Sequence, residues 1–158
     1  MKIRKLIMVV VILLSSITGL AFGQEIALHF QCSIMDAGGM EDAIYFNQLG
    51  LNAMNEGQMD YAIDAFTCAI GAEASYSAPY YNRGMVYRSL GNYTASTEDF
   101  LMALDNAGHS PSPEHYLSLA VNYDLMGQAS EAISYYKQYL ELVNEPEAWV
   151  LSQTTELN

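Results

Sequence analysis

Residues 81–104, YNRGMVYRSLGNYTASTEDFLMAL, carry small and aromatic residues at spacings that recur twice elsewhere in the chain. From Gly84, steps of 7, 12, 16 and 19 residues lead to Gly91, Ser96, Phe100 and Ala103. The same steps from Gly50 lead to Gly57, Ala62, Phe66 and Ala69, and from Ala120 to Gly127, Ala132, Tyr136 and Tyr139. The three anchors lie 34 and 36 residues apart. A period near 34 with this punctuation predicts stacked helix–turn–helix units.

The strings at residues 47–70, 81–104 and 117–140 resemble the tetratricopeptide repeat family, and the resemblance covers residues 43–144. It implies an all-α, right-handed superhelical solenoid of three repeats that holds another molecule rather than performing chemistry. In such repeats the small anchor residue permits close approach of the two helices of a unit. The glycine seven residues later ends the first helix with a positive φ. Tyr139 departs from the pattern, and we attribute it to the end of the array.

The predicted helices follow from this register. They span residues 41–55, 59–72, 77–90, 93–106, 113–126 and 129–143, within repeats at 43–76, 77–110 and 113–144 of a 41–144 array. Ser112 and Pro113 open the fifth helix as N-cap and first helical residue. Residues 145–158 are predicted to form a capping helix at 147–157, with Trp149, Val150 and Leu157 toward the preceding helix.

The N-terminus predicts export. Lys2, Arg4 and Lys5 precede an apolar run, and residues 21–23, Ala-Phe-Gly, form a small-x-small cleavage site. We interpret residues 1–23 as a secretory signal peptide, which places the protein in the periplasm or outside the cell. The competing interpretation, an uncleaved membrane anchor, is disfavoured because serines, a threonine and a glycine interrupt the apolar run.

Charge restricts the partner class. The whole chain has six Lys and Arg against 18 Asp and Glu, a net charge of −12. Without residues 1–23, three cations remain against 18 acids, a net charge of −15. Such a field repels phosphate backbones and anionic lipid, so we expect a protein or peptide partner, no nucleic acid, and no stable membrane insertion after cleavage.

Residues 24–40 form an N-terminal arm whose conformation the sequence leaves open, because its apolar residues fit both a strand and a helix. We favour a helix or an extended arm packed on the first repeat. Cys32 in the arm and Cys68 in the first repeat are the only two cysteines. In an exported protein they could pair as a disulfide, or remain two half-buried thiols.

The sequence contains no recognisable catalytic constellation, phosphate-binding glycine loop or metal-ligand set, so we expect no enzyme, cofactor or metal site. The histidines are His29, His109 and His115, and no spacing among them indicates a triad. Asp60, Asp64, Glu98 and Asp99 are expected to face water.

The resemblance also implies a concave groove lined by the first helix of each unit. Three columns of equivalent residues would line it: Asn47, Tyr81 and Leu117; Leu51, Met85 and Val121; Met54, Arg88 and Asp124. Arg88 is the one cation among them and is expected to be held by Asp124, which disfavours a clamp for a terminal carboxylate. The remaining surface is apolar and suited to peptide binding. The arm would either leave this groove open or cover it.

The sequence therefore predicts an adaptor or scaffold of the cell envelope that binds a polypeptide partner through an apolar groove. The alternative within the binding class is a periplasmic chaperone that shields an apolar segment of a client. An enzyme of unrecognised type is the alternative from another class, and an assay against generic hydrolase substrates would discriminate it.

Overall fold

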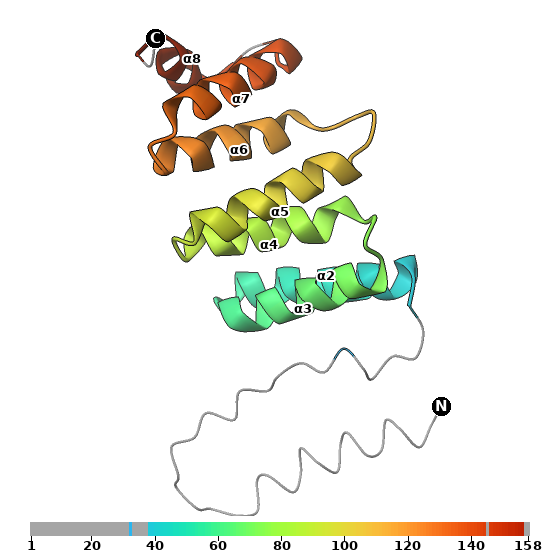
Figure 1. Ribbon diagram of the computed structural model, residues 1–158. Coiled ribbons are helices and arrows are strands. Elements are labelled where there is room, and N and C mark those ends of the chain that lie inside the picture. Colours follow the sequence, from blue (N-terminus) through green and yellow to red (C-terminus); the bar gives the residue numbers. More distant parts are fainter. Residues whose placement is uncertain (1–31, 33–37, 145, 157–158) are drawn as a thin grey trace, which may run out of the picture.

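The computed structural model describes residue 32, residues 38–144 and residues 146–156. Within these residues the structure is all-α and contains no strand. The helices form three consecutive antiparallel pairs followed by a shorter helix (Figure 1). They are α2 (Met40–Asn55), α3 (Met59–Ala72), α4 (Ser77–Ser89), α5 (Tyr93–Asn106), α6 (Pro113–Leu125), α7 (Ala129–Leu142) and α8 (Ala148–Glu156). The all-α repeat fold expected from the spacing is confirmed, and the helix ends differ from expectation by one residue or none.

The turn inside each pair depends on the glycine seven residues after the anchor. Gly91 follows α4 with φ of 77°, and Gly57 and Gly127 have φ of 75° and 72° in the other two units. Side chains disfavour this left-handed conformation, whereas glycine adopts it without a steric penalty. The backbone N–H of Gly91 also donates to the carbonyl of Arg88, which closes the helix end. The spacing between the anchor and this glycine therefore predicts both the turn and its position.

In the first two units the two helices leave no room for a side chain at the anchor glycine. A Cβ atom added to Gly84 would lie 2.9 Å from two ring atoms of Phe100 and 3.2 Å from the backbone oxygen of Ser96. A Cβ at Gly50 would overlap the Phe66 ring in the same way. Both rings are fully buried, so the missing side chain is the space that each phenylalanine fills.

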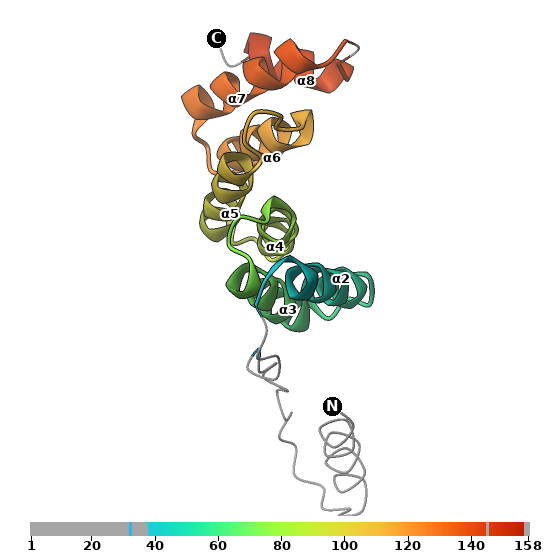
Figure 2. The same ribbon diagram turned by 90° about the vertical axis from the view of Figure 1, so that its right-hand side faces the viewer.

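The first and second helices of the units form two layers. In Figure 2, α2, α4 and α6 lie on one side of the array, and α3, α5 and α7 lie on the other. We call the side formed by α2, α4 and α6 the first-helix face. Each second helix also packs against the first helix of the next unit, which makes the core continuous along the array.

Helix α8 covers the end of the third unit. Val150 is fully buried in a cluster with Ala132, Tyr136 and Tyr139. Tyr139, the large residue at a position where the other units have alanine, therefore contacts a capping helix rather than a further repeat. Trp149 lies less deeply than expected: its side chain is 41% exposed, and its ring edge meets Tyr136 with centroids 6.1 Å apart.

Several predictions fall on residues outside the described ranges. They are the signal peptide at 1–23, the conformation of the arm apart from Cys32 and residues 38–40, and the position of Leu157. Across residues 38–144 and 146–156, no helix has both the length and the apolar character needed to cross a bilayer.

Candidate partner-binding surface

The first predicted column forms contacts between units. The Nδ2 atom of Asn82 donates to Oδ1 of Asn47 over 2.9 Å, and the hydroxyls of Tyr81 and Ser118 lie 3.2 Å apart. These pairs occupy equivalent positions in successive first helices. Asn47 is buried, and the Tyr81 ring packs against Phe100 and His115, with centroids 5.4 and 5.3 Å away. Leu117 packs on the core of the third unit. This column therefore contributes to the seam between first helices.

The second column, Leu51, Met85 and Val121, is half-buried in all three units. Leu51 packs on the cluster that contains Phe66 and Val86, and Val121 packs on the core of the third unit. Leu51 and Val121 therefore each have one part against the core and another part accessible, and Met85 is half-buried beside Arg88. Such a position can contact a partner without having to leave its own core.

The third column differs from the expectation at its charged residues. The Nη2 atom of Arg88 lies 2.8 Å from Sδ of Met85, and its guanidinium lies 5.4 Å from the Phe100 ring centroid. Within the described residues the ion pair is Arg83–Asp99, so the predicted pairing of Arg88 with Asp124 is absent. Asp124 is exposed, and Met54 is half-buried against the first core cluster. Met85 on the same helix and the Phe100 ring on α5 are therefore the contacts of Arg88.

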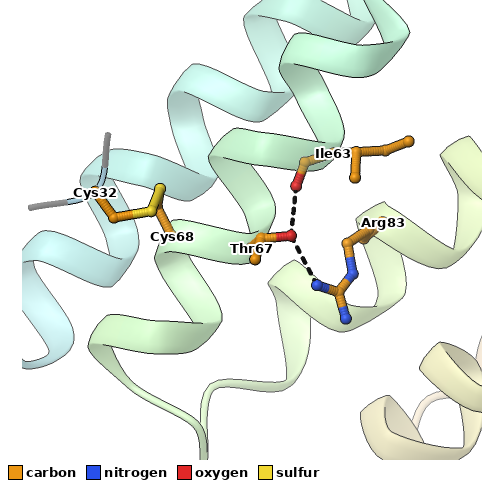
Figure 3. The surroundings of a disulfide bond; sticks show 5 residues. All are labelled: Cys32, Ile63, Thr67, Cys68 and Arg83. Atoms are coloured by element: carbon orange, nitrogen blue, oxygen red, sulfur yellow. Dashed lines mark hydrogen bonds between the residues drawn. A yellow bond between two sulfur atoms is a disulfide. The ribbon is translucent and has the colours of Figure 1, made fainter. Parts of the chain in front are cut away.

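Arg83 joins the first and second units. Its Nε and Nη2 atoms each donate to an Asp99 oxygen over 2.8 Å, and Nη1 donates to Oγ1 of Thr67 over 2.8 Å. Thr67 in turn donates to the carbonyl of Ile63 (Figure 3). The hydrogen bonds and charge of Asp99 raise the pKa of Arg83 above its ordinary value, against the opposing effect of burial. The bidentate geometry fixes the guanidinium in one orientation.

The expectation that Asp99 faces water is wrong, because its side chain is nearly buried beside Arg83. The repeat alignment contains a signal for this pair. Arg83 directly precedes its anchor glycine, where the other units have Leu49 and Leu119. At the position of Asp99, the other units have Ala65 and Tyr135. A cation and an anion both replace nonionic residues in one unit, which is the pattern of a compensating pair.

Asn122 links the second and third units. Its Nδ2 atom donates to Oγ of Ser96 over 2.7 Å and to Oγ1 of Thr97 over 3.2 Å. Those hydroxyls donate their own hydrogens to the carbonyls of Gly84 and Tyr93. Asn122 is fully buried, so the network fixes how α6 lies on α5.

A disulfide joins Cys32 to Cys68 on α3 (Figure 3). The two Cα atoms are 5.3 Å apart, a usual separation for this bond. Cys68 is buried in a cluster with Phe46 and Ala69, whereas Cys32 is exposed. Next to α2, the backbone N–H of Gly39 donates to the carbonyl of Ala72 at the end of α3. The chain preceding α2 is therefore attached to α3 at two points.

The part of the chain that the structure describes contains no group of three or more His, Cys, Asp or Glu residues positioned to hold a metal ion. Ser112 is the N-cap of α6, but its side chain makes no capping hydrogen bond. Its hydroxyl instead lies 3.0 Å from Nδ1 of His115. The His115 ring packs against Tyr81 at the seam between first helices.

Comparison with solved structures identifies helical repeats of the same kind. The first repeat domain of Spaghetti (RPAP3), bound to an HSP90 peptide, is 18% identical with a TM-score of 0.68, covering 78% of this chain and 95% of that one. YrrB, described as having an unusual peptide-binding site, is 21% identical with a TM-score of 0.67, covering 74% of this chain and 59% of that one. MamA is 28% identical with a TM-score of 0.59, covering 63% and 54%.

No curated protein matches the sequence significantly. The family model described as tetratricopeptide repeat matches residues 75–145, which contain the second and third units. The first unit has the same helix pair and the same glycine turn as those two, and it shares the glycine anchor of the second. Residues 75–145 therefore match the tetratricopeptide repeat family, and the first unit repeats their helical fold.

Proposed function

We propose that this protein is an exported adaptor that binds a polypeptide partner through its first-helix face. Repeats of this family act as modules for protein–protein interaction, and its members are typically adaptors without catalytic activity. Of the similar structures, the Spaghetti domain is bound to a peptide and YrrB is described as having a peptide-binding site. The resemblance supports the class of partner, and this chain's own residues support the surface.

The observation that carries the proposal is the middle column. Leu51, Met85 and Val121 stand at equivalent positions on α2, α4 and α6, and each is half-buried. A partner segment that lies across the three helices would therefore meet one apolar side chain from each unit. Met85 is at the centre, and its flexible thioether adapts to the shape of what it contacts. Arg88 adds one cation beside it.

A photo-cross-linking experiment tests this surface. A photoreactive amino acid is placed at Met85 in one variant and at Met102 in the other, and each full chain is expressed in its native cell. Met102 is an equally sized residue, 44% exposed on α5, and serves as the matched control. We expect one defined adduct from position 85 and none from position 102. An adduct from position 102 alone would contradict the proposed surface.

The number of adducts separates the adaptor from the chaperone. An adaptor gives one defined partner from position 85, whereas a chaperone that shields apolar client segments gives many. Mass spectrometry of the adducts identifies the partners in either case.

The location in the cell envelope is a separate part of the proposal. It is supported by the basic and apolar pattern of residues 1–23 and by the two cysteines, whose pairing an oxidising compartment permits. We expect cell fractionation to recover the protein outside the cytoplasm, with Gln24 as its N-terminal residue. Recovery of uncleaved protein in the cytosol would contradict this location.

A further inference from the structure

An open cleft of about 360 Å³ lies where the loop at residues 107–112 joins α5 to α6. It lies outside the nine candidate residues of the first-helix face. Its lining residues come from α5, the loop and the first turns of α6: Leu101, Leu104, Asp105, Gly108, Pro111 and Tyr116.

The cleft results from a difference between the two junctions that join successive units, α3 to α4 and α5 to α6. The second junction is two residues longer than the first, as the anchor spacings of 36 and 34 indicate. At the first junction Tyr80 is only 7% exposed, whereas its equivalent Tyr116 is half-buried and lines the cleft. Leu101 takes the place of Thr67, which Arg83 binds at the first junction. The loop is longer, and Leu119 stands where the first junction has Arg83, so the second junction is open and lacks the arginine contact.

The chemistry of the lining defines the occupant. Two leucines, a proline and a tyrosine offer apolar contact, and Leu101 is 37% exposed. Asp105 is the one charged lining residue; it is exposed, so a cation can reach it while remaining partly hydrated. The protein's net charge of −12 attracts a cationic segment toward any part of its surface, whereas the leucine, proline and tyrosine side chains of the lining select where it stays.

We propose that this cleft binds a short segment of a protein partner in which one bulky apolar side chain lies beside a lysine or an arginine. The apolar side chain enters between α5 and the loop, and the cation pairs with Asp105. This site is independent of the first-helix face, so a partner can engage either surface or both.

Binding is measured with the purified full chain and a synthetic peptide, Gly-Lys-Phe-Lys-Gly, by titration of backbone amide signals in NMR. Two matched peptides carry glutamates in place of the lysines or serine in place of the phenylalanine. We expect the lysine–phenylalanine peptide to bind at least about tenfold more tightly than either, with shifts concentrated in residues 101–116. Equal binding of the serine peptide would overturn the proposal, because the cleft would then contribute nothing beyond charge.

Paired variants locate the site. Asp105→Lys is matched by Glu98→Lys, an exposed acid of the same helix outside the cleft, and Leu101→Ala is matched by Met102→Ala. We expect the first member of each pair to weaken binding about threefold or more, with little change in the second. Equal weakening by both lysine variants would overturn the site, as would a loss caused by Met85→Ala but not by Leu101→Ala. The latter result would place the peptide on the first-helix face. Circular dichroism checks that every variant is folded.

Discussion

Gly84 is the position in the central unit where the fold leaves no room for a side chain. The methyl group in Gly84→Ala would meet Phe100 at 2.9 Å and a backbone oxygen at 3.2 Å, so α4 and α5 must separate. We expect this substitution to lower the free energy of unfolding by about 1–3 kcal/mol, and Gly84→Leu to lower it further. Urea unfolding followed by circular dichroism measures the change.

Gly71 is the control for that experiment. It lies in α3, and a Cβ atom added there would contact nothing within 4 Å. Gly71→Ala should therefore stabilise the protein by about 0.5–1 kcal/mol, through the higher helix propensity of alanine. Equal destabilisation by both alanine substitutions would contradict the close approach at Gly84.

Tyr136 should make the protein sensitive to alkaline pH. Burial raises the pKa of Tyr136 from 10.0 to about 12, and the charge of Asp124 adds to the effect. Above pH 10 the unfolded chain releases this proton while the folded chain retains it. Stability is therefore complete below pH 10 and falls as the pH rises toward 12.

The variant Tyr136→Phe tests this dependence, because it has no proton to lose. Melting temperatures measured from pH 9 to pH 12 should fall less steeply in the variant than in the wild type. Some slope remains, since burial also raises the pKa of Tyr61 and Tyr135. Parallel profiles for the two proteins would indicate that Tyr136 ionises as easily in the folded state as in the unfolded one.

The sequence predicts those residues whose role depends on local backbone geometry, such as the glycine of each turn. It predicts less well the side chains whose role depends on a neighbour in another helix. Arg88 was expected beside Asp124 because the two share a column, yet it contacts Met85 and Phe100 instead. Periodicity places residues on faces but does not specify rotamers, and the rotamer decides which neighbour a long side chain reaches.

At the scale of elements, the helices could be predicted to within one residue because proline and glycine mark their ends. The arrangement at the second junction could not be predicted in the same way. The anchor spacing of 36 shows that this junction has two additional residues, but it does not predict the open cleft that the structure places there. Whether an insertion bulges outward or separates two helices depends on how the side chains pack. The number of residues between two anchors does not specify that packing.

The link between Cys32 and α3 leads to a prediction for the stability of the first unit. The bond spans a sequence separation of 36 residues, so it restricts the unfolded chain by about 3–4 kcal/mol in the chain-entropy model. We expect a reducing agent to lower the melting temperature of the wild type. We also expect the purified, denatured protein to contain no thiol that reacts with an alkylating agent.

Cys32→Ser provides the matched control, because Cys32 is exposed and its replacement leaves the buried Cys68 in its cluster. The variant should melt at the temperature of the reduced wild type and should not respond to the reducing agent. Two alkylatable thiols in protein purified without reductant would mean that the cysteines are not paired in the cell.

For the whole molecule, the balance of charge determines how stability depends on salt. The whole chain has a net charge of −12, and only Arg83, Arg88 and Lys137 lie among the acids of residues 41–144. Repulsion among the carboxylates opposes the compact state, and dissolved ions screen it. We expect the melting temperature to rise when NaCl increases from about 0.01 M to about 0.15 M, over which the screening length shortens several-fold. A fall would indicate that the Arg83–Asp99 pair outweighs the general repulsion.

The attachment of Cys32 to α3 also determines how the molecule carries mechanical load. When the two ends of the oxidised chain are pulled apart, tension passes from Cys32 directly to Cys68, and α2 lies outside the loaded path. In a single-molecule stretching experiment, the fully extended chain should lengthen by roughly 120 Å after reduction, since 36 residues at about 3.4 Å each are released. A partner that pulls on the N-terminal side would therefore load α3 first. Helix α2 would bear no tension while the disulfide is intact.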